Sequence, residues 1–365
     1  MKRAIRISSN VAVRSENFQS LLASFRAGEW WEHKLVPIIM MFYATGLMLE
    51  ASLARLWPSL LILLFALVPG AAYVSVINDF TDRAEDLIAG KANRLAGRSR
   101  GAIIAFIGIP VALGLLFVAQ WHNDPLLLLF YIAAWLSFSL YSLPPFRLKV
   151  RGLAGVFADA AGAHLFPTLL AVVLAFRSMG RSVDPYWLGT VAIWALAYGL
   201  RGILWHQLND LENDRIARVP TFAQRHPPRT VAALAKFIIL PVELSGFSAL
   251  LWQVGSPLPG IALALYAAMI AAQVHWLAMH ATIVGTPPRF LIVMREYYGV
   301  FFPIAVLLAS SLRYPSDLAI LGAHLLLFPR SVVHTTADFR RLLYQARIEL
   351  RQSLYKERLQ RSQKR

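Results

Sequence analysis

The chain has no cysteine, and charged residues make up only 15% of its 365 positions. The first absence excludes disulfide bonds, thiolate catalysis and cysteine-ligated metal sites. The second argues against a water-soluble domain, in which about a quarter of the residues are charged. Acidic residues are especially scarce, at 20 against 36 Lys and Arg. We interpret the formal charge of +16 as charge that orients a membrane protein and contacts membrane lipids, and we expect no nucleic-acid partner.

The sequence contains long apolar runs, and 57% of its residues are hydrophobic. Stretches that reach the roughly 20 residues needed to cross a bilayer predict an all-α polytopic membrane protein. The N-terminal segment contains no apolar core of the signal-peptide type, so we expect no cleavage there. We predict about nine transmembrane helices, at 36–53, 58–79, 101–120, 124–143, 152–175, 186–206, 230–252, 259–282 and 297–312.

Basic residues predict how these helices are oriented. If the N-terminus is inside, the outer loops between the nine spans hold only Arg55, Arg177 and Arg181, whereas the inner loops are basic. Positive charge accumulates on the cytoplasmic side of membrane proteins. We therefore expect the inner loops on the cytoplasmic face, and we expect the membrane to be a bacterial plasma membrane.

Three regions follow one another along the chain: a basic cytoplasmic segment at 1–34, the transmembrane domain at 35–314, and a tail at 315–365. In the tail, the apolar stretch 318–328 is either a tenth span or an interfacial helix. Residues 334–365 are basic with apolar residues at helical spacing, which predicts an amphipathic helix on anionic headgroups. This helix lies inside if 318–328 crosses the membrane and outside if it does not.

An acidic motif ends the second predicted span. Asp82 and Asp86 are four residues apart and therefore share one helix face, with Asn78 one turn earlier. Carboxylates repel one another at this spacing, and a divalent cation would offset the repulsion. Mg²⁺ prefers oxygen ligands and commonly takes one or two carboxylates together with substrate phosphates. Taken alone, however, the motif could also be a solvated helix end.

The sixth predicted span ends in a second copy of this pattern. Asp210 and Asp214 lie 128 positions after Asp82 and Asp86. The match predicts an internal duplication, in which two pseudo-repeated halves each present a carboxylate face to a central cavity. Two such faces could hold two metal ions around one diphosphate.

A diphosphate also needs cationic partners, and two inner loops supply them. One loop carries Lys91 and Arg94, and the other carries Arg147 and Lys149. Arginine suits bidentate phosphate contacts, whereas lysine acts as a point charge. Each of these residues could instead be orienting charge, which is how we interpret Arg98, Arg100 and Arg151.

At these residues the sequence resembles the UbiA superfamily of intramembrane prenyltransferases, over about 30–314. Its Asn-Asp-x-x-Asp-x-x-x-Asp signature matches Asn78, Asp79, Asp82 and Asp86, its Asp-x-x-x-Asp matches Asp210 and Asp214, and its inner loop matches Tyr141-Ser142-x-Pro144-Pro145. The resemblance implies nine helices around a cavity that opens to inner-face loops. It implies Mg²⁺ between a diphosphate and Asn78, Asp82, Asp86, Asp210 and Asp214, with Asp79 orienting these ligands. It further implies substrate contacts from Lys91, Arg94, Tyr141, Ser142, Arg147 and Lys149.

The sequence departs from many members of that superfamily at His206 and Gln207, where they carry Asn or Asp. We consider His206 as a catalytic base for the acceptor, a residue of the metal shell, or a packed histidine. Arg201, one turn and a half earlier, could bind an acceptor carboxylate or pair with a motif aspartate.

Ionisable residues inside spans are rare enough to suggest function. Besides Arg201, they are Asp159, His164, Glu243 and His275. Asp159 lies in a run of small residues that is typical of close helix packing, so we expect an interhelical hydrogen bond from it.

The sequence thus predicts Mg²⁺-dependent transfer of an isoprenyl group from a polyprenyl diphosphate to an acceptor, which we expect to be aromatic. One alternative is phosphoribosyl transfer to a polyprenyl phosphate. Another is a cation transporter, but transporter carboxylates belong at mid-span, whereas these lie at the inner helix ends beside basic loops. A scaffold role leaves the paired motifs unexplained.

Overall fold

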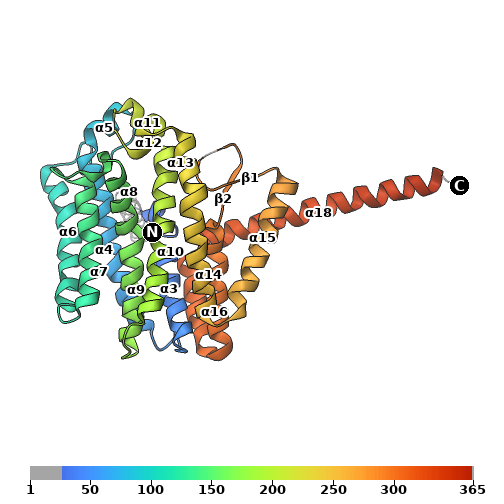
Figure 1. The fold of residues 1–365 in the computed structure, drawn as a ribbon, viewed down its shortest axis with the longest axis horizontal. Helices are drawn as coiled ribbons and strands as arrows, with labels where there is room; N and C mark the ends of the chain where they lie inside the picture. Colours follow the sequence, from blue (N-terminus) through green and yellow to red (C-terminus); the bar gives the residue numbers. More distant parts are fainter. Residues whose placement is uncertain (1–26, 286, 364–365) are drawn as a thin grey trace, which may run out of the picture.

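The computed structural model describes residues 27–285 and 287–363, which form a bundle of helices that run roughly side by side (Figure 1). The long unbroken helices are α3 (Leu35–Met48), α4 (Trp57–Thr81), α6 (Arg100–Gln120), α7 (Pro125–Ser142), α10 (Pro185–Asn209) and α15 (Pro257–Leu277). Three further helices contain a π-helical turn: α8-η2-α9 (Leu153–Ser178), α13-η3-α14 (Pro228–Val254) and η4-α16 (Tyr297–Arg313). Shorter helices are α2 (Ala27–Trp30), α5 (Arg83–Ile88), η1 (Leu148–Val150), α11 (Leu211–Ile216), α12 (Phe222–Arg225) and η5 (Pro315–Asp317).

Seven helical segments of the described residues are long and apolar enough to cross a membrane. They confirm the all-α polytopic fold. The two remaining predicted spans correspond to α3 and η4-α16, which are shorter apolar helices. The count of nine therefore stays a prediction.

The predicted span 259–282 is wrong at its C-terminal end. Helix α15 ends at Leu277, and Ala278 adopts a left-handed conformation with φ of 50°. The chain then enters β1 (His280–Thr282), which pairs in parallel with β2 (Phe290–Ile292). Helix termination is thus set by backbone conformation, although the sequence stays apolar up to this point.

The three π-helical turns share a local cause. Each is followed by a proline two residues after the turn, at Pro167, Pro241 and Pro303. Proline lacks an N–H group and crowds the carbonyl four residues before it, and a wider turn relieves that contact. A π-turn acts as one inserted residue and changes which side chains face inward.

Helix α8 packs closely against α10. A Cβ atom added at Gly199 would lie 2.8 Å from the carbonyl oxygen of Ala160, so the two backbones are nearly in contact. This confirms the close packing expected for the small residues around Asp159.

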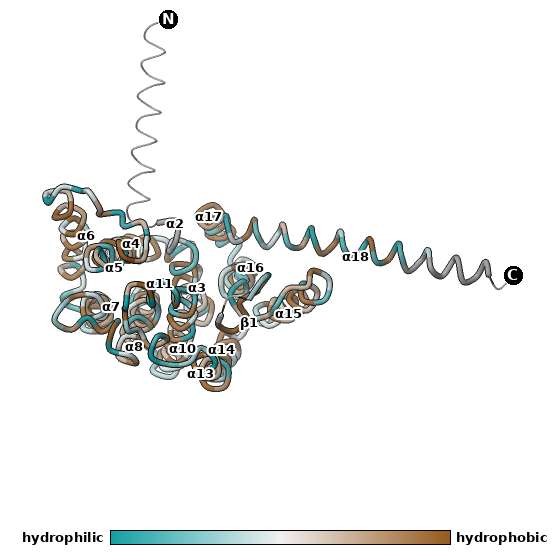
Figure 2. The backbone as a smooth tube through the Cα atoms, turned by 90° about the horizontal axis from the view of Figure 1, so that it is seen from above, coloured by the Kyte–Doolittle hydropathy of each residue, from teal (hydrophilic) through white to brown (hydrophobic). Residues whose placement is uncertain are grey.

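The C-terminal tail begins with α17 (Leu318–Leu327), which turns by 84° into α18 (Pro329–Gln363). Both views show α18 extending away from the bundle (Figures 1 and 2), and the predicted helical tail is confirmed. The Glu32 carboxylate caps α18 by accepting hydrogen bonds from the backbone N–H groups of Arg330 and Ser331, at 2.8 and 2.7 Å. The tail therefore leaves the bundle beside the residues that precede α3.

Candidate active site

The two acidic motifs have nearly the same backbone. Asp82 lies between α4 and α5 with φ and ψ of −99° and 11°, and Asp210 lies between α10 and α11 with −91° and 4°. Each short helix is followed by a residue in the left-handed conformation, Gly90 after α5 and Arg218 after α11. These two residues are again 128 positions apart. Helices α5 and α11 lie at the same end of the bundle (Figure 1). The internal duplication predicted from the sequence is thus visible in the local structure.

The second aspartate of each motif is held by an equivalent side chain. Asn93 donates a hydrogen bond of 2.8 Å to Asp86, and Thr221 donates one of 3.1 Å to Asp214. Asn93 and Thr221 are also 128 positions apart. Neither was singled out from the sequence, although the 128-residue offset would have paired them.

Asp82 lies among the cations of the loop that follows α7. The Lys149 ammonium forms an ion pair with the Asp82 carboxylate, and the Arg147 guanidinium lies 3.5 Å from it. Arg147 also binds Glu85 at 2.6 Å. Burial raises the pKa of Glu85, but the hydrogen bonds to its carboxylate and the charges of Arg147 and Lys149 together outweigh burial and leave the pKa below its ordinary value. Arg147 and Lys149 therefore lie at the first motif, and their contact with a diphosphate stays a prediction.

The other inner loop joins the two halves of the molecule. The Lys91 ammonium lies 3.1 Å from a carboxylate oxygen of Asp210, although the two residues are 119 positions apart. Arg94 lies 3.8 Å from Asp79, whose side chain is only 1% exposed. Asp79 is thus more deeply buried than Asp82 or Asp210, each of which is 24% exposed.

The end of α7 contacts the first motif directly. The Ser142 hydroxyl donates a hydrogen bond to Oδ1 of Asn78, and Ser142 is fully buried. Tyr141 and Ser142, which the resemblance assigned to an inner loop, form the last turn of α7.

His206 lies on the rim of the second motif. Its side chain is 61% exposed, and its Nε2 atom lies 3.7 Å from Asp210. The packed-histidine interpretation is therefore wrong. Nearby, burial raises the pKa of Asp214, and this effect outweighs the opposing hydrogen bond from Thr221.

Arg201 does not pair with a motif aspartate. Its Nε and Nη2 atoms donate hydrogen bonds of 2.6 and 2.7 Å to the Glu243 carboxylate, and both side chains are almost completely buried. The bidentate pair satisfies two ionisable groups that the sequence had flagged separately. Of the two roles considered for Arg201, pairing with a motif aspartate is therefore wrong, because Glu243 of the adjacent helix α14 binds the guanidinium.

The residues of the two motifs fit Mg²⁺ by their donor chemistry. All are oxygen donors, and each motif offers two carboxylates at one end of the bundle. No group of three or more His, Cys, Asp or Glu in the described part of the chain could hold a metal ion. Mg²⁺ needs only one or two carboxylates when phosphate oxygens complete its shell. The set therefore suits an ion that is shared with a phosphorylated ligand.

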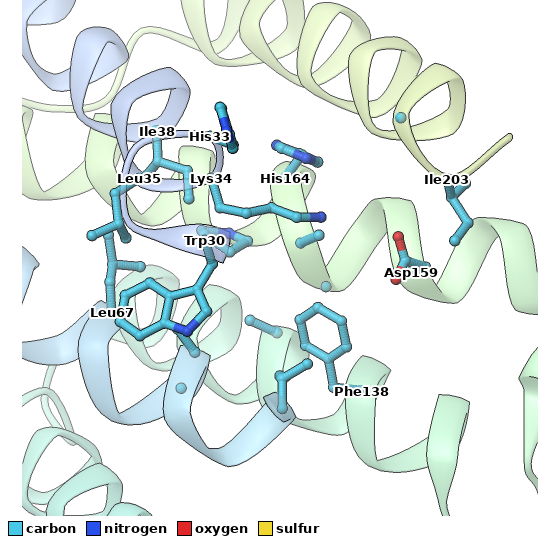
Figure 3. Close-up of a pocket in the computed structure, with 18 of the residues that line it drawn as sticks. Trp30, His33, Lys34, Leu35, Ile38, Leu67, Phe138, Asp159, His164 and Ile203 are labelled. Atoms are coloured by element: carbon cyan, nitrogen blue, oxygen red, sulfur yellow. The ribbon is translucent and has the colours of Figure 1, made fainter. Parts of the chain in front are cut away.

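A cavity of about 750 Å³ opens beside the motifs. Asn78 and His206, one from each motif, line it together with Arg201. Aromatic side chains form much of its wall: Trp30, Tyr73, Tyr131, Trp135, Phe138, Tyr198 and Trp205. Figure 3 shows Trp30 and Phe138 in this wall, with Lys34, Asp159 and His164. The cavity thus lies beside the two motifs and has a largely aromatic wall.

Asp159 differs from its prediction. It faces this cavity and makes no side-chain hydrogen bond with any described residue. The expected interhelical hydrogen bond is therefore wrong. Gly199 brings the helices so close that backbone contact takes the place of a polar link.

A sequence model of the UbiA prenyltransferase family matches residues 39–287. The chain belongs to the UbiA prenyltransferase family. As a member of this family, it is an integral, multi-pass membrane transferase that acts in prenyl transfer. No curated protein sequence matches the chain.

The fold of this UbiA family member is similar to that of a solved protein, described as a UbiA homolog from Archaeoglobus fulgidus bound to GPP and Mg²⁺. The TM-score is 0.52 at 15% sequence identity, and the match covers 82% of this chain and 99% of the other. The resemblance therefore extends over the whole of the archaeal protein, although few residues are shared.

Proposed function

We propose that this protein transfers an isoprenyl group from an isoprenyl diphosphate to an aromatic acceptor, with Mg²⁺ as cofactor. The observation that carries the proposal is the pairing of Lys91, Arg147 and Lys149 with aspartates of the two motifs, beside a cavity with a largely aromatic wall. The GPP and Mg²⁺ of the archaeal homolog support the same assignment.

The ionic end suits the leaving group of this reaction. When the allylic C–O bond breaks, negative charge develops on the diphosphate and must be stabilised. Lys91, Arg147 and Lys149 now pair with aspartates, so their positive charge is already held at the site. Mg²⁺ bound by Asn78, Asp82, Asp86, Asp210 and Asp214 would act as a Lewis acid on the diphosphate oxygens.

The cavity suits the rest of the donor. The prenyl chain is apolar, and the cation that forms at its allylic end must be kept from water. The faces of aromatic rings such as Trp135 and Phe138 can stabilise such a cation. An aromatic acceptor can stack in the same wall.

The donor and the metal are tested together. We expect purified protein to consume radiolabelled geranyl or farnesyl diphosphate in the presence of Mg²⁺ and a pool of acceptors, with products identified by mass spectrometry. EDTA should abolish the reaction and excess Mg²⁺ should restore it. Full activity in EDTA would contradict the metal assignment. Consumption of phosphoribosyl diphosphate alone would instead support the phosphoribosyl alternative.

The orientation is tested by labelling, for which the cysteine-free chain is a ready background. We propose that the active-site loops face the cytoplasm. Ala96→Cys, exposed in the loop after α5, should then react with an impermeant maleimide only in inverted vesicles. Asn123→Cys, exposed at the opposite end of the bundle, should react only in right-side-out vesicles. The reverse pattern would overturn the assignment.

A further inference from the structure

Helix α18 contacts the bundle at helix ends that lie on one side. Glu32, which caps α18, comes just before α3. Trp276, in the last turn of α15, donates a hydrogen bond of 2.7 Å to Glu349 of α18. The orientation predicted from the basic loops puts the start of α3 and the end of α15 on the inner side of the membrane, together with the two aspartate motifs.

Helix α17, which leads into α18, is held at its other end by the outer loop between α3 and α4. The buried Asp317 carboxylate accepts hydrogen bonds from the backbone N–H groups of Leu53 and Ala54, at 3.0 and 2.9 Å. From Asp317 to Arg330 a helix rises only about 20 Å, less than the roughly 30 Å of a hydrocarbon core. Figure 1 also shows α18 leaving the bundle below the level of α5 and α11. Helix α18 therefore starts at the depth of the lipid headgroups or deeper.

The direction of α18 differs from that of the spans. Helix α17 packs against α16 and then turns by 84° into α18. In Figure 1, α18 runs across the bundle helices, and Figure 2 shows it pointing outward from them. A helix that crosses the spans at nearly a right angle runs parallel to the membrane plane. Amphipathic helices that bind a membrane surface have this orientation.

Charge is segregated around α18. Its carboxylates Asp338 and Glu349 face the bundle, where they accept hydrogen bonds of 3.1 and 2.7 Å from side chains of α15. Three exposed arginines lie seven and four residues apart, so they share another face of the helix. We call them the basic stripe: Arg340, Arg347 and Arg351. The bundle thus takes up acidic groups of α18 and leaves this row of positive charge outside.

An apolar row lies beside the basic stripe. We call it the apolar stripe: Phe339, Leu343 and Leu350, which are 41%, 59% and 61% exposed. Phe339 and Leu350 directly precede two arginines of the basic stripe, so the two stripes are about 100° apart around the helix. In a surface helix, apolar side chains in this arrangement enter the acyl boundary while the neighbouring arginines reach the headgroups.

The far part of α18 also needs a surface to rest on. The helix continues to Gln363, beyond the contact of Glu349 with α15, and both views show it extending away from the bundle. Most helical stability in proteins comes from packing of an amphipathic face, and a short helix without it is marginal in water. A membrane surface would supply that packing.

We propose that α18 lies in the plane of the inner membrane leaflet and binds anionic phospholipids, on the same side as the active-site loops. The apolar stripe enters the acyl boundary, and the basic stripe binds the phosphate groups. Anionic lipids are favoured because basic segments are attracted to a negatively charged leaflet. This surface is separate from the prenyl-transfer site, so the proposed function and this assignment can fail independently.

The test measures the depth of α18 in the full-length protein, reconstituted in vesicles of phosphatidylcholine and phosphatidylglycerol. The chain has no cysteine, so single cysteines introduced from position 333 to 351 can each carry a nitroxide spin label. Electron paramagnetic resonance reports collisions with oxygen, which concentrates in lipid, and with a water-soluble nickel chelate. Labels at Ile109→Cys, exposed on α6, and Ala96→Cys, exposed in an inner loop, provide the lipid and water references.

We expect the ratio of oxygen to nickel collisions to rise and fall with the helical repeat. It should be severalfold higher at Leu343→Cys and Leu350→Cys than at Arg347→Cys. Uniformly frequent nickel collisions would show a helix in water and overturn the proposal. Rare collisions with both reagents along the apolar stripe, with spectra broadened by neighbouring labels, would show contact with a second copy of the chain and would also overturn it.

The lipid charge is tested with the label at Leu350→Cys. Vesicles of phosphatidylcholine alone should lower its oxygen-to-nickel ratio. Neutralising the basic stripe with Arg340→Gln/Arg347→Gln/Arg351→Gln should abolish the difference between the two lipid mixtures. The matched control removes three other exposed arginines, Arg100→Gln/Arg229→Gln/Arg289→Gln, and should keep the difference. A stripe variant that keeps it would refute binding of anionic lipid.

The side of the membrane is tested by comparison with the inner loop. Gln352→Cys, exposed on α18, should react with an impermeant maleimide in the same vesicle orientation as Ala96→Cys. Reaction of the two cysteines from opposite sides would overturn the placement of α18. Because the comparison is between two positions of one chain, it holds whichever face of the membrane the active-site loops occupy.

Discussion

Replacing either Asp82 or Asp210 by alanine should reduce prenyl transfer by roughly a hundredfold or more, because each removes a carboxylate that would hold metal and substrate. The double variant should be little worse than either single one, since residues that act as a unit are strongly non-additive. Because Asp82 pairs with Lys149 and Arg147, and Asp210 pairs with Lys91, each substitution also removes an ion pair, and the comparison of turnover uses only variants that remain folded. Product formation from a radiolabelled prenyl diphosphate and a thermal melt in detergent measure the two effects.

Glu212→Ala is the matched control for this pair. Glu212 lies on the same short helix that follows Asp210, but its side chain is 66% exposed and pairs with Arg215. Its loss should leave turnover within about twofold of the wild type. A folded Asp82→Ala protein with most of its turnover would refute the central role of the motif.

Breaking the ion pair between Arg201 and Glu243 should destabilise the protein more than any exposed substitution. Arg201→Met leaves a buried carboxylate without its partner, which typically costs about 3–5 kcal/mol. Glu243→Leu should have a similar effect, because it strands the guanidinium. The combined Arg201→Met/Glu243→Leu variant should recover most of the loss, since neither charge remains. Thermal unfolding in detergent measures all three, and additive losses would contradict the coupling.

The exposed pair of Arg215 and Glu212 serves as the control. Its atoms are also 2.6 Å apart, but both side chains are about two-thirds exposed. Water and salt screen such a pair, so Arg215→Met should not measurably change the melting temperature. The contrast isolates burial as the cause of the effect at Arg201.

Apolar length predicted most of the fold, because a bilayer demands continuous apolar helices. It predicted α4, α6 and α7 almost to the residue. It failed at the end of α15, where the left-handed Ala278 ends the helix inside an apolar run. It also gave no sign of the π-turns, which depend on how a proline is accommodated rather than on hydropathy.

The site was predictable where it is local in sequence. The four-residue spacing of Asp82 and Asp86 fixes one helix face, and the repeat at Asp210 marks the second. Contacts between distant parts of the chain left no such signature. The partnership of Lys91 with Asp210, and that of Arg201 with Glu243, depend on which helices pack together, so only the folded chain reveals them.

The residues that line the cavity were the hardest to predict from the sequence. Lys34 falls outside every predicted span, and His164 lies in a π-helical turn that hydropathy does not indicate. A lysine that precedes the first span is normally interpreted as part of the positive charge that orients the protein in the membrane. Whether such residues line a cavity depends on how the helices pack, which a hydropathy profile does not show.

The repeated backbone at the two motifs carries unequal charge. The positions equivalent to Lys91 and Arg94, 128 residues later, are Val219 and Phe222, which are buried and apolar. Both halves therefore supply aspartates to the site, but the lysine that pairs with Asp210 comes from the loop after the first motif. At the first motif the cations beside the aspartate are Arg147 and Lys149, whereas at the second motif the cation is Lys91. The two halves are similar in backbone but differ in the cations beside their aspartates. The two ends of a bound diphosphate would therefore have different surroundings.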